Sequence, residues 1–320
     1  MAKLMKVENA AIVEVKQFGD TAIEKFIASR SISENSVKTY RNALRRLFGF
    51  FAENQIATPT EADVNAFVNN LRGTGKSVAT IRLYLTVAKA FFAWTGRKNF
   101  YPNVAADVQA RLRKSATHNK KALTLNQAQK LLGAIKGNDV ISLRNKAIIA
   151  LCLQAGLRTV EVSRADVSDL QPAIGYYTLK VQGKGHVDKD QVVKVSAPVA
   201  EMILSYLDAR GVASDGEPLF TSTSRNNSKY GARLSAQSVG KMIKATMKSV
   251  AIDDKAITAH STRHFAATTA IKAGVDLRQV SSMLRHSNLN VTMTYLHDID
   301  LESRRAELAV SDSLFGGMAC

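Results

Sequence analysis

Residues 176–181 and 191–195 are the one clear pair of β-strand patterns in this chain, and they flank a turn, G-K-G-H-V-D-K-D, typical of a hairpin. Elsewhere apolar residues recur every three or four positions, which is the spacing of one face of an α-helix. Residues 144–155 are so apolar that the helix they form must be buried. The expected fold class is therefore mainly α-helical with a small β-hairpin or sheet.

The length of 320 residues favours two domains, because domains usually contain about 100 to 200 residues. The expected division is a helical N-terminal domain over 1–112, a basic linker over 113–122 and a second domain over 123–320. Within the first domain, residues 1–20 are expected to be a loosely ordered arm, and a short helix is expected from Val104. Thr124 and Gln127 fit a capping box, which marks the first helix of the second domain.

The chain is strongly basic, with 44 Lys and Arg against 27 Asp and Glu and a net charge of +17. Residues 1–122 carry 20 of the basic and 9 of the acidic residues, so the excess is greatest there. A polyanion such as DNA is the natural partner, because cations that neutralise phosphates release condensed counterions. Seven basic residues are candidate DNA contacts: Lys38, Arg41, Arg45, Lys76, Arg82, Lys120 and Lys121.

Lys38, Arg41 and Arg45 form a basic stripe along one expected helix, although such a stripe is equally typical of a solvated helix face. No apolar run is long enough to span a membrane, and the start of the chain lacks the apolar core of a signal peptide. Cys152 and Cys320 imply no disulfide framework. We therefore expect a cytoplasmic protein with no membrane contact.

Ala259–His297 gathers histidines, an arginine and a tyrosine within two apolar-periodic segments. Cleavage of a phosphodiester needs a nucleophile, fixed cations for the non-bridging oxygens and a proton donor for the leaving oxygen. Two arginines can clamp the phosphate bidentately, and nearby positive charge lowers the cost of forming a phenolate. The residues that fill these roles are Tyr295, Arg158, Arg263, His260, His286 and Lys184.

Several of these residues also fit other roles. His260 and His264 are four apart, like a zinc pair, but Ser261 stands where the metalloprotease pattern has Glu, so no metal is expected. His264 is expected to be a packed helix residue, and Glu161 is expected to orient a neighbour. Gly75-Lys76-Ser77 does not complete a nucleotide-binding loop, because Asn70 stands in place of its first glycine.

Together these residues resemble the tyrosine recombinases, also called phage integrases. The likeness consists of four boxes in order: A-G-L-R-T-V-E ending at Glu161, the Lys184 of G-K-G, H-x-x-R from His260 to Arg263, and L-R-H followed nine residues later by Tyr295. The basic helical domain resembles the core-binding domain of that family. The resemblance implies an α+β catalytic domain after it.

The resemblance also implies a mechanism and partners. Tyr295 would attack DNA to leave a 3′-phosphotyrosyl link and a free 5′-hydroxyl, with strand exchange through a Holliday junction. Arg158 and Arg263 would bind the phosphate, Lys184 would be the acid, and His260 and His286 would donate hydrogen bonds or move protons. No cofactor would be needed. The expected assembly is a homotetramer on double-stranded DNA with paired recombination sites, in which the segment from about residue 298 docks in trans.

Some positions depart from the common pattern of the family. Arg285 stands where many members have Gly, and the sequence after G-K-G leaves open whether Lys184 or Lys189 is the acid. The expected role is an integrase of a phage or mobile element, with a chromosome-dimer resolvase or DNA invertase as the alternative. A type IB topoisomerase and a non-catalytic DNA-binding protein are the remaining readings.

Overall fold

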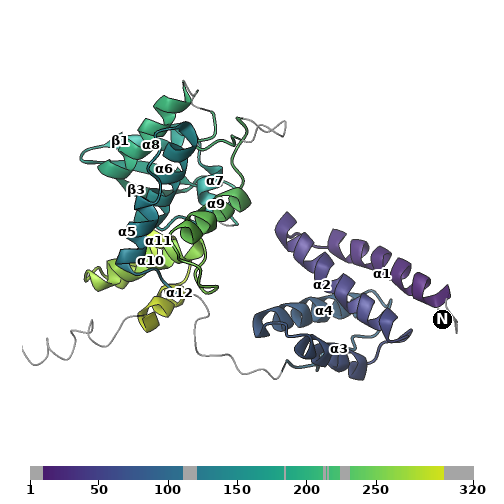
Figure 1. Cartoon of the computed structure of the whole chain (residues 1–320). Coiled ribbons are helices and arrows are strands. Elements are labelled where there is room, and N and C mark those ends of the chain that lie inside the picture. Colours follow the sequence, from purple (N-terminus) through teal and green to yellow (C-terminus); the bar gives the residue numbers. More distant parts are fainter. Residues whose placement is uncertain are drawn as a thin grey trace, which may run out of the picture. The chain divides into compact units, whose positions relative to one another are not determined.

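The protein is described by a computed structural model, which places residues 10–110, 121–183, 185–211, 214, 216–223 and 231–298. The chain divides into two compact units, residues 1–116 and 117–320 (Figure 1). Most of the predicted linker, 113–122, and the predicted docking segment beyond residue 298 lie outside the described residues. Each unit is described by itself.

The described part of the first unit consists of helices around one core of aromatic residues (Figure 1). Its helices are α1 (Ala10–Ala28), α2 (Glu34–Glu53), α3 (Glu61–Gly73) and α4 (Val78–Arg97). Ser33 and Ser77 cap α2 and α4 with their hydroxyl groups, which accept from the backbone N–H groups of Ser36 and Thr80. Phe26 lies edge-on to Phe91, with ring centroids 5.4 Å apart, which joins α1 to α4.

Two expectations for the first unit differ from the structure. Residues 10–20 of the expected arm are the first part of α1, because Ile23 and Phe26 further along this helix are buried in the aromatic core. Residues 104–110 form turns instead of a short helix. Lys89 on α4 donates to the carbonyl of Ala106 at 2.9 Å, so this carbonyl has a partner without a helical bond.

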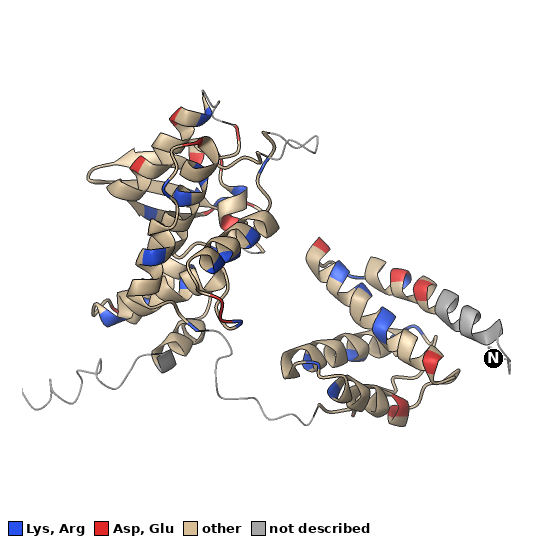
Figure 2. Cartoon of the chain, viewed as in Figure 1, with Lys and Arg blue, Asp and Glu red and all other residues tan. Residues whose placement is uncertain are grey.

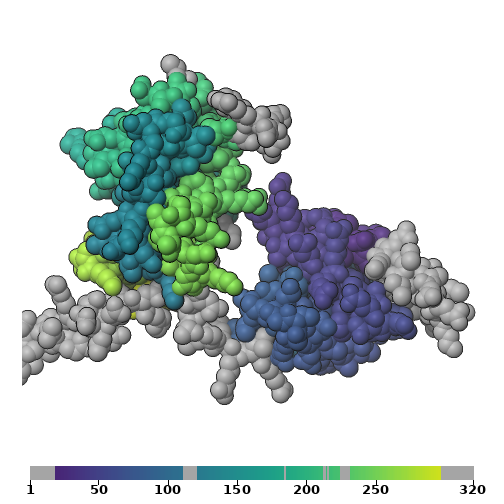
Figure 3. Space-filling model, viewed as in Figure 1, coloured from purple at the N-terminus to yellow at the C-terminus, as the bar shows by residue number. Residues whose placement is uncertain are grey.

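The second unit is built on a buried central helix, α6. Its helices are α5 (Leu125–Gly133), α6 (Val140–Ala155), α7 (Thr159–Arg164), α8 (Ala197–Arg210), α9 (Ala236–Ser249), α10 (His260–Lys272), α11 (Leu277–Leu284) and α12 (Leu289–Met293), with 3₁₀ turns η1 (Val167–Asp169) and η2 (Thr294–Asp298). α5, α8, α9 and α10 all contact α6. Figure 3 shows residues of α6, in teal, beside later, green residues on one face of this unit.

A three-stranded antiparallel sheet lies beside these helices in the order β1-β2-β3. β2 (Tyr176–Val181) and β3 (Gln191–Ser196) are the predicted hairpin, with Leu179 opposite Val193. β1 (Leu170–Ala173) was missed by the sequence analysis because three of its four residues are exposed, so it lacks an alternating apolar pattern. The mainly α-helical fold with a small sheet is confirmed.

Gly156 brings three helices together at the end of α6. Its φ of 57° is left-handed, which ends the helix, and glycine adopts this conformation without steric cost. A Cβ at this position would lie 2.8 Å from Leu284 Cδ2 on α11 and 3.3 Å from Ala266 Cβ on α10. The close approach of these helices to residue 156 places the following residues, from Leu157, against α10 and α11.

No helix in the described part of the chain is long and apolar enough to cross a membrane.

Replacing Gly156 with Ala tests this packing. Gly156→Ala is expected to lower the free energy of unfolding by about 1–3 kcal/mol, because the added methyl group both strains the left-handed backbone and overpacks Leu284. Urea unfolding measures the change. Gly175→Ala is the matched control, since φ there is 80° and a Cβ would meet no atom within 4 Å. Equal losses in the two variants would contradict the close approach at Gly156.

Candidate active site

Arg158 and Glu161 lie at the start of α7, immediately after the Gly156 turn. Arg158 is the residue before the helix, and its backbone N–H donates to Glu161 Oε2 at 2.8 Å. Its Nη1 donates to Glu161 Oε1, also at 2.8 Å. The Arg158 side chain is 25% exposed, whereas that of Glu161 is completely buried. Glu161 therefore accepts hydrogen bonds from both the backbone and the guanidinium of Arg158.

A second arginine, Arg285, shares the same carboxylate. Its Nη2 lies 2.8 Å from Glu161 Oε2, and both side chains are essentially buried. Burial alone would raise the pKa of Glu161, but the charge and hydrogen bond of Arg285, with smaller effects of Arg158 and Arg263, hold this pKa below its usual value. The carboxylate is therefore ionised, and it balances part of the positive charge of the site.

Arg263 on α10 is the most deeply buried cation of the site, with 1% of the residue exposed. Its Nη1 donates to the carbonyl of Gly156 at 2.7 Å, and its Nη2 donates to the carbonyl of Leu284. Its Nε–H is buried with no hydrogen-bond partner among the described residues. Burial and the charges of Arg158 and Arg285 lower its pKa to about 10, which still leaves it charged at neutral pH.

Tyr295 lies among three histidines. Its ring is edge-on to His264, with centroids 4.8 Å apart, and stacked with His286 at 6.1 Å. His264 is in turn edge-on to His260 at 5.1 Å. Only 3% of Tyr295 is exposed, and it shares an apolar cluster with Leu284. The tyrosine, the histidines and Arg263 therefore form one group built from α10, the loop after α11 and η2.

His286 is fixed by a residue that the sequence analysis missed. Its Nδ1 lies 2.8 Å from the hydroxyl of Thr292, which is fully buried on α12. Burial, together with the charges of Arg263, Arg158, Arg285 and His260, lowers the pKa of His286 to about 4. His286 is therefore neutral at physiological pH. A threonine six residues after a histidine carries no sequence signal, because the contact depends on how the loop folds.

Of the two hairpin lysines, only Lys189 lies within the described residues, and Lys184 lies outside them. Lys189 donates to Asp166 at 2.5 Å and also to Asp169, and Arg233 pairs with Asp166 as well. These two carboxylates bind the ammonium group of Lys189 within the protein, which anchors the hairpin.

The candidate DNA contacts are only partly available for phosphate. Arg41 binds both oxygens of Glu24 at 2.7 and 2.8 Å, and Arg45 pairs with Asp20 at 3.2 Å, so α1 neutralises two residues of the predicted stripe (Figure 2). Lys121 pairs with Asp254 at 3.1 Å. These pairs are exposed, and such pairs are weak enough for phosphate to replace the carboxylate.

The remaining candidate DNA contacts differ in exposure. Lys38 and Lys76 are exposed, Arg82 is partly buried, and Lys120 lies outside the described residues.

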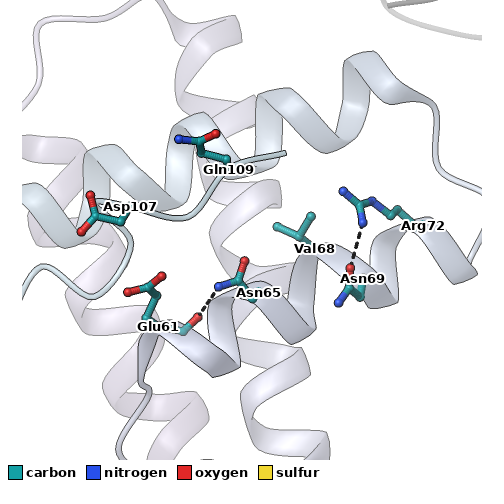
Figure 4. A pocket seen from close by; sticks show the side chains of 7 residues that line it. All are labelled: Glu61, Asn65, Val68, Asn69, Arg72, Asp107 and Gln109. Atoms are coloured by element: carbon teal, nitrogen blue, oxygen red, sulfur yellow. Dashed lines mark hydrogen bonds between the residues drawn. The ribbon is translucent and has the colours of Figure 1, made fainter. Parts of the chain in front are cut away.

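Three other kinds of site are poorly supported by the described residues: an anion-binding hollow, a cysteine nucleophile and a metal site. A shallow hollow of about 280 Å³ on the first unit is lined by Glu61 and Asp107 at one end and Arg72 at the other (Figure 4), and the two carboxylates disfavour an anionic ligand beside them. Burial raises the pKa of the Cys152 thiol to about 12, so it is not a nucleophile. Within the described ranges no three His, Cys, Asp or Glu side chains are grouped to hold a metal ion.

Two protein-family models match this chain. Residues 121–302 match the model of the phage integrase family, and residues 23–99 match its N-terminal SAM-like domain. The chain belongs to the phage integrase family. It is a tyrosine recombinase, an enzyme class that cleaves and rejoins DNA strands.

Named relatives have similar lengths. Tyrosine recombinase XerD of Halalkalibacterium halodurans is 27% identical over 275 residues, which cover 84% of this chain and 88% of the relative. XerC of Mycobacterium bovis is 30% identical over 277 residues, with 83% and 88% covered.

Solved structures show the same fold. The XerH site-specific recombinase, bound to palindromic difH substrate in a post-cleavage complex, has a TM-score of 0.72 at 21% identity and covers 97% of this chain and 90% of its own. The Tn1549 transposon integrase, in complex with transposon right end DNA, has a TM-score of 0.70 at 20% identity and covers 93% and 99%.

The recombinase should become less stable in mild acid because of His286. Its folded pKa of about 4 is below the usual 6.5, so the unfolded chain takes up the proton first. The contribution of neutral His286 to the free energy of unfolding is complete above pH 6.5 and is lost as the pH falls towards 4. Urea unfolding at several pH values measures this slope, which should be smaller in His286→Gln. An unchanged slope in that variant would contradict the lowered pKa.

Proposed function

We propose that Tyr295 of this recombinase is the nucleophile of site-specific DNA strand cleavage. The observation that carries the proposal is its position in a group that also contains Arg263, His260 and His286, which the packing of α10, α11 and η2 brings together. The positive charge of Arg263 favours the phenolate, and the neutral His286 can accept a proton. Such a site suits attack on a phosphodiester.

The proposed reaction conserves the energy of the broken bond. The Tyr295 oxygen bonds to the DNA phosphorus, the bond to the 5′ oxygen breaks, and a 3′-phosphotyrosyl link forms. The tyrosine gives up one proton and the departing 5′ oxygen takes up one, so the step balances. Attack by a 5′-hydroxyl of the partner duplex reverses these changes, and a second pair of exchanges resolves the Holliday junction.

Arg158 and Arg263 are proposed to bind the non-bridging oxygens of the phosphate. Arg158 is partly exposed, and the Nε–H of Arg263 is a buried donor that a phosphate oxygen would satisfy. His260 and His286 are proposed to donate hydrogen bonds or move protons. Because only 3% of Tyr295 is exposed, its attack requires movement of the segment that carries it, α12 and η2.

Lys184 is proposed as the acid that protonates the leaving 5′ oxygen. The ion pairs of Lys189 with Asp166 and Asp169 support this choice over Lys189, since they already bind its ammonium group within the protein.

At the level of the whole protein, we propose a helical core-binding domain up to residue 112, a basic linker and a catalytic domain from residue 123. These would act as a homotetramer in the cytoplasm on two DNA sites, with the segment after about residue 298 docking in trans. Integration of a phage or mobile element is the proposed outcome, and the shared fold of the Tn1549 transposon integrase supports it. Dimer resolution or inversion is the second candidate, because the curated relatives named above are XerD and XerC.

Replacing Tyr295 with Phe tests the nucleophile. With a nicked duplex that carries the recombination site, wild type should accumulate a covalent protein–DNA adduct, and Tyr295→Phe should form none because the attacking oxygen is missing. Denaturing gel electrophoresis measures the adduct. Tyr176→Phe on β2 is the matched control and should cleave normally. An adduct with Tyr295→Phe would show that another residue attacks the phosphate.

Assays with plasmid substrates distinguish the candidate biological functions. A recombinase joins two sites, whereas a type IB topoisomerase relaxes supercoils on DNA with one site or none. Recombination between sites on separate plasmids supports integration, and recombination restricted to two sites on one plasmid supports resolution or inversion. A non-catalytic DNA-binding protein would do none of these.

A 5′-bridging phosphorothiolate tests the acid. Sulfur leaves as a thiolate without a proton, so Lys184→Ala should cleave normal DNA about 10²- to 10⁴-fold more slowly than wild type but recover most of the rate on the modified DNA. Single-turnover cleavage rates measure both. Lys189→Ala is the comparison and should not show selective recovery. Selective recovery of Lys189→Ala instead of Lys184→Ala would reverse the assignment.

A further inference from the structure

Arg285 has a backbone conformation that is costly for its side chain. It follows α11 with φ 55° and ψ 48°, the left-handed region that glycine usually occupies at the end of a helix. Its N–H donates to the carbonyl of Ser281 or Ser282, so the turn closes the helix in the ordinary way. A long side chain at this position is uncommon, and it suggests that the side chain itself has a function.

The Arg285 side chain connects three parts of the site. Its Nη2 donates to Glu161 Oε2 at 2.8 Å and lies 3.4 Å from the carbonyl oxygen of Gly156, and its Nη1 donates to the carbonyl of Met283 at 2.5 Å. Only 2% of the side chain is exposed. Arg285 therefore ties the end of α11 to the start of α7 and to the turn after α6. All three of its guanidinium nitrogens have acceptors within the protein, so none is left for a phosphate oxygen.

The two oxygens of Glu161 are shared between two arginines. Oε1 accepts from Arg158 Nη1 at 2.8 Å and from Arg285 Nε at 3.4 Å. Oε2 accepts from Arg285 Nη2 and from the backbone N–H of Arg158, both at 2.8 Å. Without Arg285, the buried carboxylate would have the Arg158 guanidinium as its nearest charge partner and would bind it more strongly. A bidentate grip by Glu161 would turn the Arg158 fork away from the DNA phosphate.

With Arg285 in place, Arg158 is held through one nitrogen. The structure gives the Arg158 side chain no other hydrogen bond within the described residues, so its Nη2 is available to a phosphate oxygen. Arg285 thus limits how much of the Arg158 fork is taken by Glu161.

We propose that Arg285 is a positioning residue for strand cleavage, which holds Glu161 Oε2 so that Arg158 keeps part of its guanidinium for the DNA phosphate. The inference rests on the proposed function, because it assumes that Arg158 binds the phosphate. Arg285 acts through Glu161 and has no contact with DNA of its own. It affects the rate of cleavage more than the affinity for DNA.

Four variants test the proposal with the nicked duplex: Arg285→Met, Arg285→Lys, Glu161→Gln and the double variant Arg285→Met/Glu161→Gln. Arg285→Met should slow adduct formation about 100-fold, because misplacement of a clamp by about 1 Å costs a factor of this order. DNA affinity in a gel-shift assay should change only a few-fold. Arg285→Lys should restore part of the rate, since it keeps the charge but not the forked geometry.

The double variant separates positioning from simple loss of structure. Removing both charges leaves no unpaired buried carboxylate to capture Arg158, so the double variant should cleave faster than Arg285→Met. If Arg285→Met does not fold, Arg285→Lys and the double variant still provide this comparison. Thermal unfolding gives the folded fraction, by which each rate is divided. Equal rates per folded molecule in wild type, Arg285→Met and Arg285→Lys would overturn the proposal.

The dependence of the cleavage rate on pH provides a second measurement, which a loss of packing alone would not change. His286 faces Arg263 and His260 from α10, Arg158 before α7, Arg285 beside it, Thr292 on α12 and Tyr295 in η2. Loss of one of these positive charges should move the acid limb of the cleavage profile to higher pH in Arg285→Met. Arg278→Met removes an exposed charge from the same helix and is the matched control, with the limb unmoved.

Failure of the two proposals can be told apart. If wild type forms no adduct, or Tyr295→Phe forms one, the proposed nucleophile is wrong whatever Arg285 does. If wild type cleaves through Tyr295 but Arg285→Met and Arg285→Lys cleave equally well and with the same pH profile, only the role of Arg285 is wrong.

Discussion

Glu161 is ionised although none of its side chain is exposed, and this burial is tolerated because Arg158 and Arg285 both donate hydrogen bonds to its oxygens. Removing one partner from a buried ion pair typically costs about 3–5 kcal/mol, which is a large part of the stability of a protein domain. The ion pairs also join α7 to the end of α11. The site and the packing of the second unit therefore depend on the same carboxylate.

The Gly156 turn makes this arrangement possible. Its carbonyl accepts from Arg263 at 2.7 Å and lies 3.4 Å from Arg285 Nη2, so one backbone oxygen orients two of the three arginines. The absent Cβ lets Leu284 approach to the same point. Three guanidinium groups gather around a single carboxylate, which leaves a local excess of positive charge. Burial and that excess of charge together lower the pKa of His286, and the excess suits a phosphate ligand.

Tyr295 is too buried in the described structure to reach a DNA phosphate. Its ring packs between His264 and His286 and against Leu284, while it is carried by a 3₁₀ turn after the short helix α12. Short elements with few buried contacts are the parts of a fold that open at least cost. The proposed attack of Tyr295 on a DNA phosphate therefore requires α12 and η2 to move.

Much of this recombinase could be predicted from local sequence signals, because Ser33, Ser77 and Thr124 act on their own helices and the β2–β3 hairpin pairs neighbouring segments. The same holds for Arg158 and Glu161, which are one helical turn apart. Tertiary structure decided the contacts between distant segments. These include the packing of α1 on α2, the exposed strand β1, the Thr292 bond to His286 and the buried pair of Arg285 with Glu161. Arg285 and Glu161 are 124 positions apart in the sequence. Their contact depends on how the helices pack, and no local sequence pattern indicates it.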